Sequence, residues 1–236
     1  MKAAFGFLSV LPFGGSPRRS TLAFFAVVGA VLGAVLAAVG SGISRFAGTA
    51  EVAVVMVAAD LALTGMLHFD GLADCGDGLL AHLEPERRRE VMKSPEVGAF
   101  GVVAVVVVVL ARFVGFMELD AVSALWMVVP LWSLARLSMA VALTRGRYLT
   151  PGGIGTYFDR TTLPWWVVVA LAAVTVGLTW RFGDVRGVVS LLAVVVGFGV
   201  TVAFAYRRIG GLTGDVLGAA GIVGETLGLL VGGLRW

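Results

Sequence analysis

Three aspartates lie four and then three residues apart, at Asp70, Asp74 and Asp77. On a helix this spacing places three carboxylates on one face. Like charges this close repel one another and favour protonation, and a divalent cation removes that penalty. Mg²⁺ prefers carboxylate oxygens and keeps water ligands that a substrate phosphate can replace. We therefore predict that these aspartates bind Mg²⁺; the alternative is a solvated acidic loop at a membrane boundary.

Glycines alternate with these aspartates, and a histidine precedes them. Gly71, Gly76 and Gly78 have no side chain, so we interpret them as backbone that a bulky ligand can approach. His68 stands two residues before the first aspartate. Its type and position are consistent with a catalytic base or a phosphate contact, and equally with a structural hydrogen-bonding residue.

Basic side chains stand in both long polar connections, residues 69–97 and 144–163. Lys93 follows the run Arg87–Arg89 in the first, and Arg145 and Arg147 open the second. Arg offers phosphate a bidentate fork and Lys a point charge. We predict that Lys93, Arg145 and Arg147 bind phosphate, although the first run alone is more typical of a surface helix with paired charges.

The second connection also contains a glycine-rich stretch, residues 151–160. The backbone N–H groups around Gly153 and Gly155 can wrap a phosphate, and the same stretch can be a simple turn between helices.

A fourth aspartate, Asp215, stands in the glycine-rich stretch 210–219. Ionisable groups in or beside a bilayer are costly and are usually functional or paired. Asp215 is therefore predicted to be a general base or a further metal ligand. The alternative is an ion pair with Arg112 or Arg136, which lie in apolar segments themselves, and Asp60 could pair with a buried Arg in the same way.

The composition indicates a membrane protein. Of the 236 residues, 58% are hydrophobic and 14% charged, whereas soluble domains have roughly a quarter charged. A helix needs about 20 apolar residues to cross the hydrocarbon core. The continuous apolar runs lack the polar alternation of a barrel, so we expect one all-α, polytopic domain over residues 1–236 with six to seven transmembrane helices. The predicted spans are residues 22–44, 50–68, 98–117, 121–143, 164–181, 187–206 and 212–234, the last being either a full span or a re-entrant helix.

The loops between these spans predict the orientation. Twelve of the eighteen basic residues fall on the side of the N-terminus: Lys2, Arg18, Arg19, Arg87, Arg88, Arg89, Lys93, Arg145, Arg147, Arg160, Arg207 and Arg208. The positive-inside rule places this side in the cytoplasm. We expect a multi-pass protein of a bacterial or archaeal cytoplasmic (inner) membrane, with its active site facing the cytoplasm.

The same composition limits the partners. The net charge of +3 comes from short loops and does not indicate a nucleic-acid-binding protein, and the single cysteine, Cys75, excludes an internal disulfide. Glycine-rich apolar segments pack closely in lipid, which makes a homo-oligomer plausible. A transporter would carry its key polar groups near the midplane, whereas most candidates here map to span ends. This placement, with Mg²⁺ and cationic side chains, favours a membrane enzyme of phosphoryl or nucleotidyl-linked transfer.

Several motifs together resemble the cobalamin synthase family, the adenosylcobinamide-GDP ribazoletransferases. The motifs run in the family's order over nearly the whole chain: residues 4–12, His68-x-Asp70-Gly71-Leu72-Ala73-Asp74-x-x-Asp77-Gly78, residues 89–101, and residues 210–219 followed by Glu225. The family often has an acidic residue after the lysine equivalent to Lys93, where this chain has Ser94-Pro95-Glu96.

The resemblance implies a reaction. Members of this family join α-ribazole, or its 5′-phosphate, to adenosylcobinamide-GDP, and they require Mg²⁺. Our hypothesis for the mechanism is that Mg²⁺ binds Asp70, Asp74 and Asp77 and that Asp215, or else His68, takes the proton of the α-ribazole hydroxyl. A CDP-alcohol phosphotransferase is an alternative, although the Asp-Gly-x₂-Ala-Arg motif of that class has no counterpart after Asp70-Gly71. A transporter and a scaffold for other enzymes are the remaining alternatives.

Overall fold

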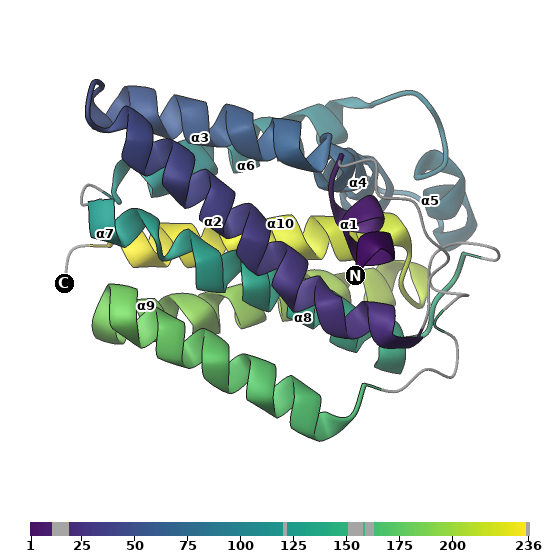
Figure 1. Ribbon diagram of the computed structural model, residues 1–236. Helices are drawn as coiled ribbons and strands as arrows, with labels where there is room; N and C mark the ends of the chain where they lie inside the picture. Colours follow the sequence, from purple (N-terminus) through teal and green to yellow (C-terminus); the bar gives the residue numbers. More distant parts are fainter. Residues whose placement is uncertain (11–18, 120–121, 151–157, 159–162, 235–236) are drawn as a thin grey trace.

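The structure, a computed structural model, describes residues 1–10, 19–119, 122–150, 158 and 163–234 (Figure 1). All regular elements in these ranges are helices. In chain order they are α1 (Lys2–Leu8), the 3₁₀ helix η1 (Arg19–Phe24), α2 (Phe25–Ile43), α3 (Thr49–Thr64), α4 (Leu67–Cys75), the π-helix η2 (Gly76–Leu80), α5 (Pro85–Val91), α6 (Ala99–Met117), α7 (Val122–Leu125), α8 (Val128–Arg145), α9 (Trp165–Ile209) and α10 (Gly214–Gly233). The all-α prediction is confirmed.

Four helical segments are long and apolar enough to cross a membrane in the described part of the chain: Ser20–Ile43, Ala99–Met117, Asp184–Ile209 and Gly214–Gly233. A fifth span is possible if the bent pair Thr49–Thr64 and Leu67–Leu80 is counted as one. The chain is thus a multi-pass membrane protein, and the predicted six to seven spans slightly exceed this number. Part of the difference lies in α9, whose first arm, Trp165–Arg181, is shorter than a full span.

α9 is two helical arms joined at a sharp kink. Asp184 has φ 48° and ψ −140°, which no helix accommodates. The second arm turns back along the first, so that a Cβ on Gly187 would lie 2.4 Å from Cγ2 of Thr179. The two arms correspond to the predicted spans 164–181 and 187–206 (Figure 1).

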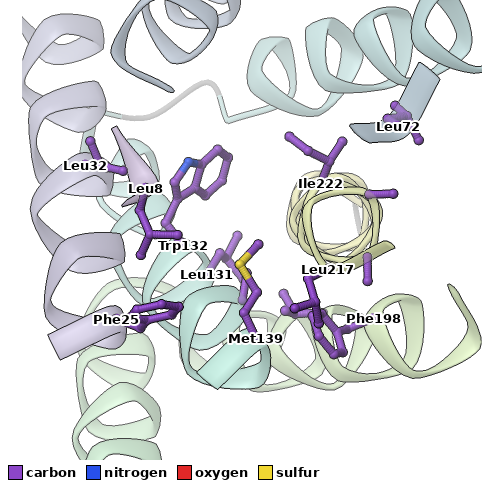
Figure 2. Packing of buried hydrophobic residues seen from close by; sticks show 14 of the residues in the cluster. Leu8, Phe25, Leu32, Leu72, Leu131, Trp132, Met139, Phe198, Leu217 and Ile222 are labelled. Atoms are coloured by element: carbon purple, nitrogen blue, oxygen red, sulfur yellow. The ribbon is translucent and has the colours of Figure 1, made fainter. Parts of the chain in front are cut away.

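α10 runs through the middle of the bundle and is the best enclosed of the four apolar segments: 78% of its apolar window is buried, against 22% in α6. Its small residues allow this, since a Cβ on Gly224 would lie 2.8 Å from the carbonyl oxygen of Val194 in α9. The helix is continuous over 20 residues. Figure 2 shows Leu217 and Ile222 of this helix among the buried side chains of the bundle.

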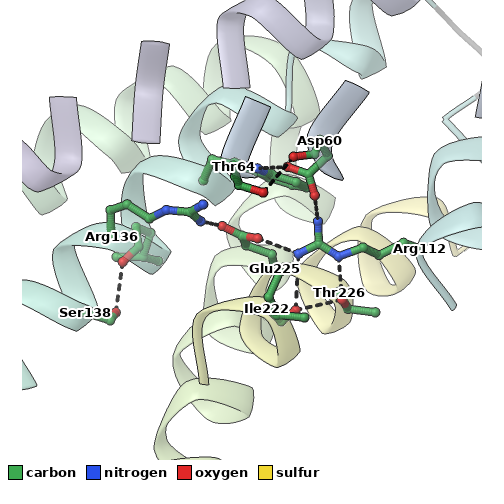
Figure 3. Close-up of polar contacts among 10 residues, drawn as sticks. Asp60, Thr64, Arg112, Arg136, Ser138, Ile222, Glu225 and Thr226 are labelled. Carbon is green, nitrogen blue, oxygen red and sulfur yellow. Dashed lines mark hydrogen bonds and ion pairs between the residues drawn. The ribbon is translucent and has the colours of Figure 1, made fainter. Parts of the chain in front are cut away.

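A group of buried charges lies at the centre of the bundle (Figure 3). Arg112 of α6 pairs with Asp60 of α3 and with Glu225 of α10, and Arg136 of α8 pairs with the other oxygen of Glu225. The indole N–H of Trp132 donates to Asp60 at 3.0 Å. The two positive and two negative charges cancel, which makes their burial tolerable in an apolar interior. The predicted pairing of Asp60 with a buried Arg is confirmed.

α4 lies across one end of the bundle and not along it. The chain bends by 93° between α3 and α4, at Gly65 and Met66, which both have φ near 59°. This left-handed backbone is easy for Gly and unusual for Met. α4 therefore lies outside the segments that run through the bundle. The same end holds α1, α5 and the short loop before α10 (Figure 1).

Candidate active site

Asp70 and Asp74 lie one turn apart on α4, where Asp70 is exposed and Asp74 half-buried. Asp77 is buried and has a different task. Its two carboxylate oxygens accept the backbone N–H groups of Gly98 (2.7 Å) and Gly101 (2.9 Å), so it caps the start of α6. The predicted shared face depends on an α-helix through residue 77, but the chain becomes π-helical at Gly76, which changes the register of Asp77.

Asp215 comes to this group from the far end of the sequence. Thr213 caps α10 by accepting the N–H of Val216 at 3.2 Å, and Asp215 stands in the first turn. At this point α10 crosses α4 so closely that a Cβ on Gly71 would lie 2.8 Å from Cα of Asp215. The absence of a side chain at Gly71 therefore brings the two helices, and their carboxylates, together.

Burial, together with the neighbouring carboxylates, changes the acidity of Asp74. Burial raises the pKa of Asp74 to about 7, and the negative charges of Asp215, Asp70 and Asp77 raise it in the same direction. Asp74 is thus half-protonated near neutral pH. A cation bound here would relieve the repulsion and displace the proton.

The donor chemistry fits Mg²⁺, since all four groups are carboxylates. Within the residues described, however, no three His, Cys, Asp or Glu side chains stand close enough together to hold a metal ion. Asp77 can add a ligand only with the lone pairs that its two backbone hydrogen bonds leave free. Mg²⁺ binding by Asp70, Asp74 and Asp77 stays a prediction.

A cavity of about 360 Å³ opens beside Asp215. We call it the charged cavity; its lining is Glu86, Arg89, Glu90, Met92 and Lys93 from α5 and the residues after it, Leu149 and Thr150, and Thr213 and Asp215. It brings Lys93 and Asp215 together, as expected for two residues of one site. Arg89 adds a second cation, which the sequence alone did not separate from its neighbours in the run Arg87–Arg89.

The loop after α8 forms one wall of the charged cavity. It runs beside the loop before α10: Leu149 N–H donates to the Leu212 carbonyl, and Leu212 N–H to the Arg147 carbonyl, each at 2.8 Å. The side chains of Arg145 and Arg147 are exposed and do not line the charged cavity. Gly153 and Gly155 lie outside the described residues.

A buried arginine binds the backbone carbonyl groups at and after Gly78. Arg88 of α5 donates to the carbonyl oxygens of Gly78, Leu79 and Ala81, at 2.9, 3.0 and 2.8 Å. These groups would otherwise be unpaired at the end of η2. A Cβ on Gly78 would meet the Met92 side chain at 2.2 Å, so protein fills this space. A ligand contact at Gly78 stays a prediction.

His68 does not line the charged cavity but lies near Asp215 in a different part of the bundle. It is buried, 5% exposed, and its Nε2 has no hydrogen-bond partner among the described residues. Burial, and then the positive charges of Arg136 and Arg112, lower the pKa of His68 well below its usual value. The imidazole is therefore neutral.

His68 and Asp215 share a second cavity of about 240 Å³, between α1, α2, α4, α8 and α10. We call it the apolar cavity; its lining is Phe7, Leu8, Phe25, Leu67, His68, Met139, Leu143, Gly214, Asp215, Leu217 and Gly218. Figure 2 shows Leu8, Phe25 and Met139 in this part of the bundle. Asp215 thus stands between a charged and an apolar cavity.

Comparison with known proteins identifies the family. A family model described as cobalamin-5-phosphate synthase matches residues 1–233. The chain belongs to this family. An adenosylcobinamide-GDP ribazoletransferase of Desulforamulus reducens is 31% identical over 232 residues, which cover 96% of this chain and 92% of the relative. One of Syntrophobacter fumaroxidans is 35% identical over 240 residues, with 95% and 94% covered. No solved structure matches the chain.

Membership of the cobalamin-5-phosphate synthase family makes the chain a transferase and confirms the resemblance seen in the motifs. It decides against the transporter, the scaffold and the CDP-alcohol phosphotransferase. The alternative that Asp215 pairs with a buried arginine is also excluded, because Arg112 and Arg136 pair with Asp60 and Glu225.

Proposed function

We propose that the protein joins α-ribazole, or its 5′-phosphate, to adenosylcobinamide-GDP. A ribose hydroxyl of the acceptor, other than the 5′ oxygen that carries the phosphate in α-ribazole 5′-phosphate, bonds to the phosphorus that carries cobinamide. The bond from that phosphorus to GMP breaks, and the hydroxyl loses its proton. The products are adenosylcobalamin, or its phosphate, and GMP. The relatives' names support the substrates.

The observation that carries the proposal is the position of Asp215 in the charged cavity. There it faces a cavity that Lys93 and Arg89 also line, and its backbone contacts the helix of Asp70 and Asp74. Cations that bind phosphate and a carboxylate that accepts a proton are the groups this transfer needs.

Each residue has a proposed task. Lys93 and Arg89 hold the pyrophosphate oxygens of the donor, with the exposed Arg145 and Arg147 available at the entrance. Asp215 takes the proton of the attacking hydroxyl. Mg²⁺, held by Asp70, Asp74 and Asp77, would neutralise charge on the pyrophosphate and on the GMP leaving group.

The site also has a proposed orientation. The end of the bundle with α4 and α5 carries the three arginines of α5, together with Arg207 and Arg208 at the end of α9. Arg45, Arg181 and Arg186 stand near the turns at the opposite end. By the positive-inside rule, we place the active site on the cytoplasmic face of the inner membrane.

The test is turnover by the purified protein in nanodiscs, with adenosylcobinamide-GDP, α-ribazole and either Mg²⁺ or EDTA. We expect GMP and adenosylcobalamin in equal amounts, only with Mg²⁺. Asp74→Asn should abolish turnover without unfolding the protein. Asp184→Asn, an exposed aspartate at the kink of α9, is the matched control and should keep it. Near-normal turnover by Asp74→Asn would refute the metal assignment, and no product from the folded wild type would refute the reaction.

A further inference from the structure

The apolar cavity is too small for a whole substrate. Sites for drug-sized ligands measure about 300–1,000 Å³, and this one measures about 240 Å³. Its walls include the side chains of Phe7, Phe25 and Leu8. A cavity of this size and lining suits one flat, apolar ring system and excludes a corrinoid or a pyrophosphate.

His68 gives the apolar cavity one polar group in its lining. The Nε2 atom of His68 is buried and has no partner among the described residues. An unmade hydrogen bond of a buried group is costly, so a ligand atom that pairs with it is favoured. The ring of His68 packs against α10 at Gly218, which has no side chain. A Cβ at this position would lie 3.3 Å from Nδ1 of His68.

Asp215 connects this cavity to the charged one, since this residue lines both. A molecule that occupies the apolar cavity therefore ends beside the proposed proton acceptor. The acceptor of the proposed reaction has this shape: an apolar base at one end and a ribose with the reacting hydroxyl at the other. The donor, with its pyrophosphate, suits the charged cavity.

We propose that the apolar cavity binds the dimethylbenzimidazole base of α-ribazole, and that the ring nitrogen not bonded to ribose accepts a hydrogen bond from Nε2–H of His68. This assignment rests on the proposed function and makes His68 a specificity residue instead of the catalytic base. The base packs between Phe25 and Leu8 on one side and Met139 on the other. An acyl chain of a lipid is the competing occupant.

The experiment measures KM for each substrate separately in nanodiscs. Leu8→Trp fills the apolar cavity and should raise KM for α-ribazole at least tenfold, with KM for adenosylcobinamide-GDP unchanged. Leu192→Trp, on the exposed face of α9 (60% exposed), is the matched control and should change neither. Equal changes in both KM values, or none, would refute the assignment and favour a lipid in the cavity.

His68 is tested by a pair of changes, one in the protein and one in the ligand. His68→Phe should raise KM for α-ribazole about five- to tenfold, the effect of one hydrogen bond. An analogue with carbon in place of the free ring nitrogen should bind the wild type as weakly, and His68→Phe should weaken it no further. Equal losses with both ligands would indicate a structural role for His68 and overturn this contact.

Binding of α-ribazole alone, measured by calorimetry, separates this inference from the proposed function. If the wild type forms no product yet binds α-ribazole, and Leu8→Trp abolishes that binding, the reaction is refuted and the cavity assignment stands. If the wild type turns over but Leu8→Trp binds α-ribazole normally, the assignment is refuted and the reaction stands.

Discussion

Replacing Glu225 by Gln tests the buried charges at the centre of the bundle. Glu225 is fully buried and pairs with two arginines, one through each oxygen. The neutral amide keeps the shape of the side chain and removes its charge. Arg112 keeps its pair with Asp60, whereas Arg136 loses the one ion pair that it makes within the described residues. The variant therefore leaves one uncompensated positive charge in an apolar interior.

The magnitude follows from the burial. Removing one partner of a fully buried ion pair costs about 3–5 kcal/mol. A protein of this size changes its melting temperature by about 2–4 °C per kcal/mol, so we expect Glu225→Gln to lower Tm by about 6–20 °C. Adding Arg136→Gln removes the unpaired charge. The double variant should therefore lose less than the sum of the two single losses, by about 0.5–3 kcal/mol.

The assay uses a reporter that the protein already has. Cys75 is the only cysteine and is 5% exposed, so a maleimide dye reacts with it when the bundle unfolds. Tm is read from dye fluorescence in detergent. Glu51→Gln, an exposed carboxylate at the start of α3, is the control and should shift Tm by no more than about 2 °C. If the stability loss of the double variant equals the sum of the two single losses, Glu225 and Arg136 do not stabilise each other and the reasoning is refuted.

Three further predictions concern the site. Gly71→Ala should lower turnover at least tenfold, because its Cβ would lie 2.8 Å from Cα of Asp215, whereas Gly42→Ala, with nothing within 4 Å, should be silent in the same assay. Arg88→Met should lower the stability by about 1–3 kcal/mol, and with it Tm, because it leaves without a donor the three carbonyl oxygens that Nη1 of Arg88 serves; an unchanged Tm contradicts this. The folded pKa of Asp74 is about 7, above the unfolded value of about 3.9, so this residue's contribution to stability is lost as pH rises from about 4 to 7. In the absence of metal, Tm should thus be lower at pH 8 than at pH 5. If Asp74→Asn shows the same difference in Tm between the two pH values as the wild type, Asp74 is not its cause.

Much of the fold could be predicted from the sequence because apolar run length decides it. The helical class follows from runs of about 20 apolar residues, and the pairing of Asp60 with an arginine follows from the cost of a lone charge in lipid. The identity of the arginine does not follow. Arg112 and Arg136 lie 24 residues apart in different helices, and only the packing shows that both reach Glu225.

The site was predictable in its residue types and less so in its local geometry. Asp77 looks like a third ligand because α-helical spacing places it under Asp74, but a π-helical turn and the N–H groups of α6 make it a cap. Gly71 looks like space for a ligand, and that space is filled by Asp215, 144 residues later. Contacts of such separation have no signal within a single sequence window.

The buried charges and the site are connected through one helix. Asp215 and Glu225 stand ten residues apart on α10, about 15 Å along its axis. Arg112 and Arg136 hold Glu225, and the guanidinium of Arg112 also lies 5.4 Å from the ring centre of Phe69 on α4. The same charges therefore position both helices that cross beside Asp215. A buried ion pair adds little net stability compared with apolar side chains, so we infer that this one serves the register of α10 against α4. It follows that Glu225→Gln should reduce turnover even at temperatures far below its Tm, where a purely stabilising residue would have no effect.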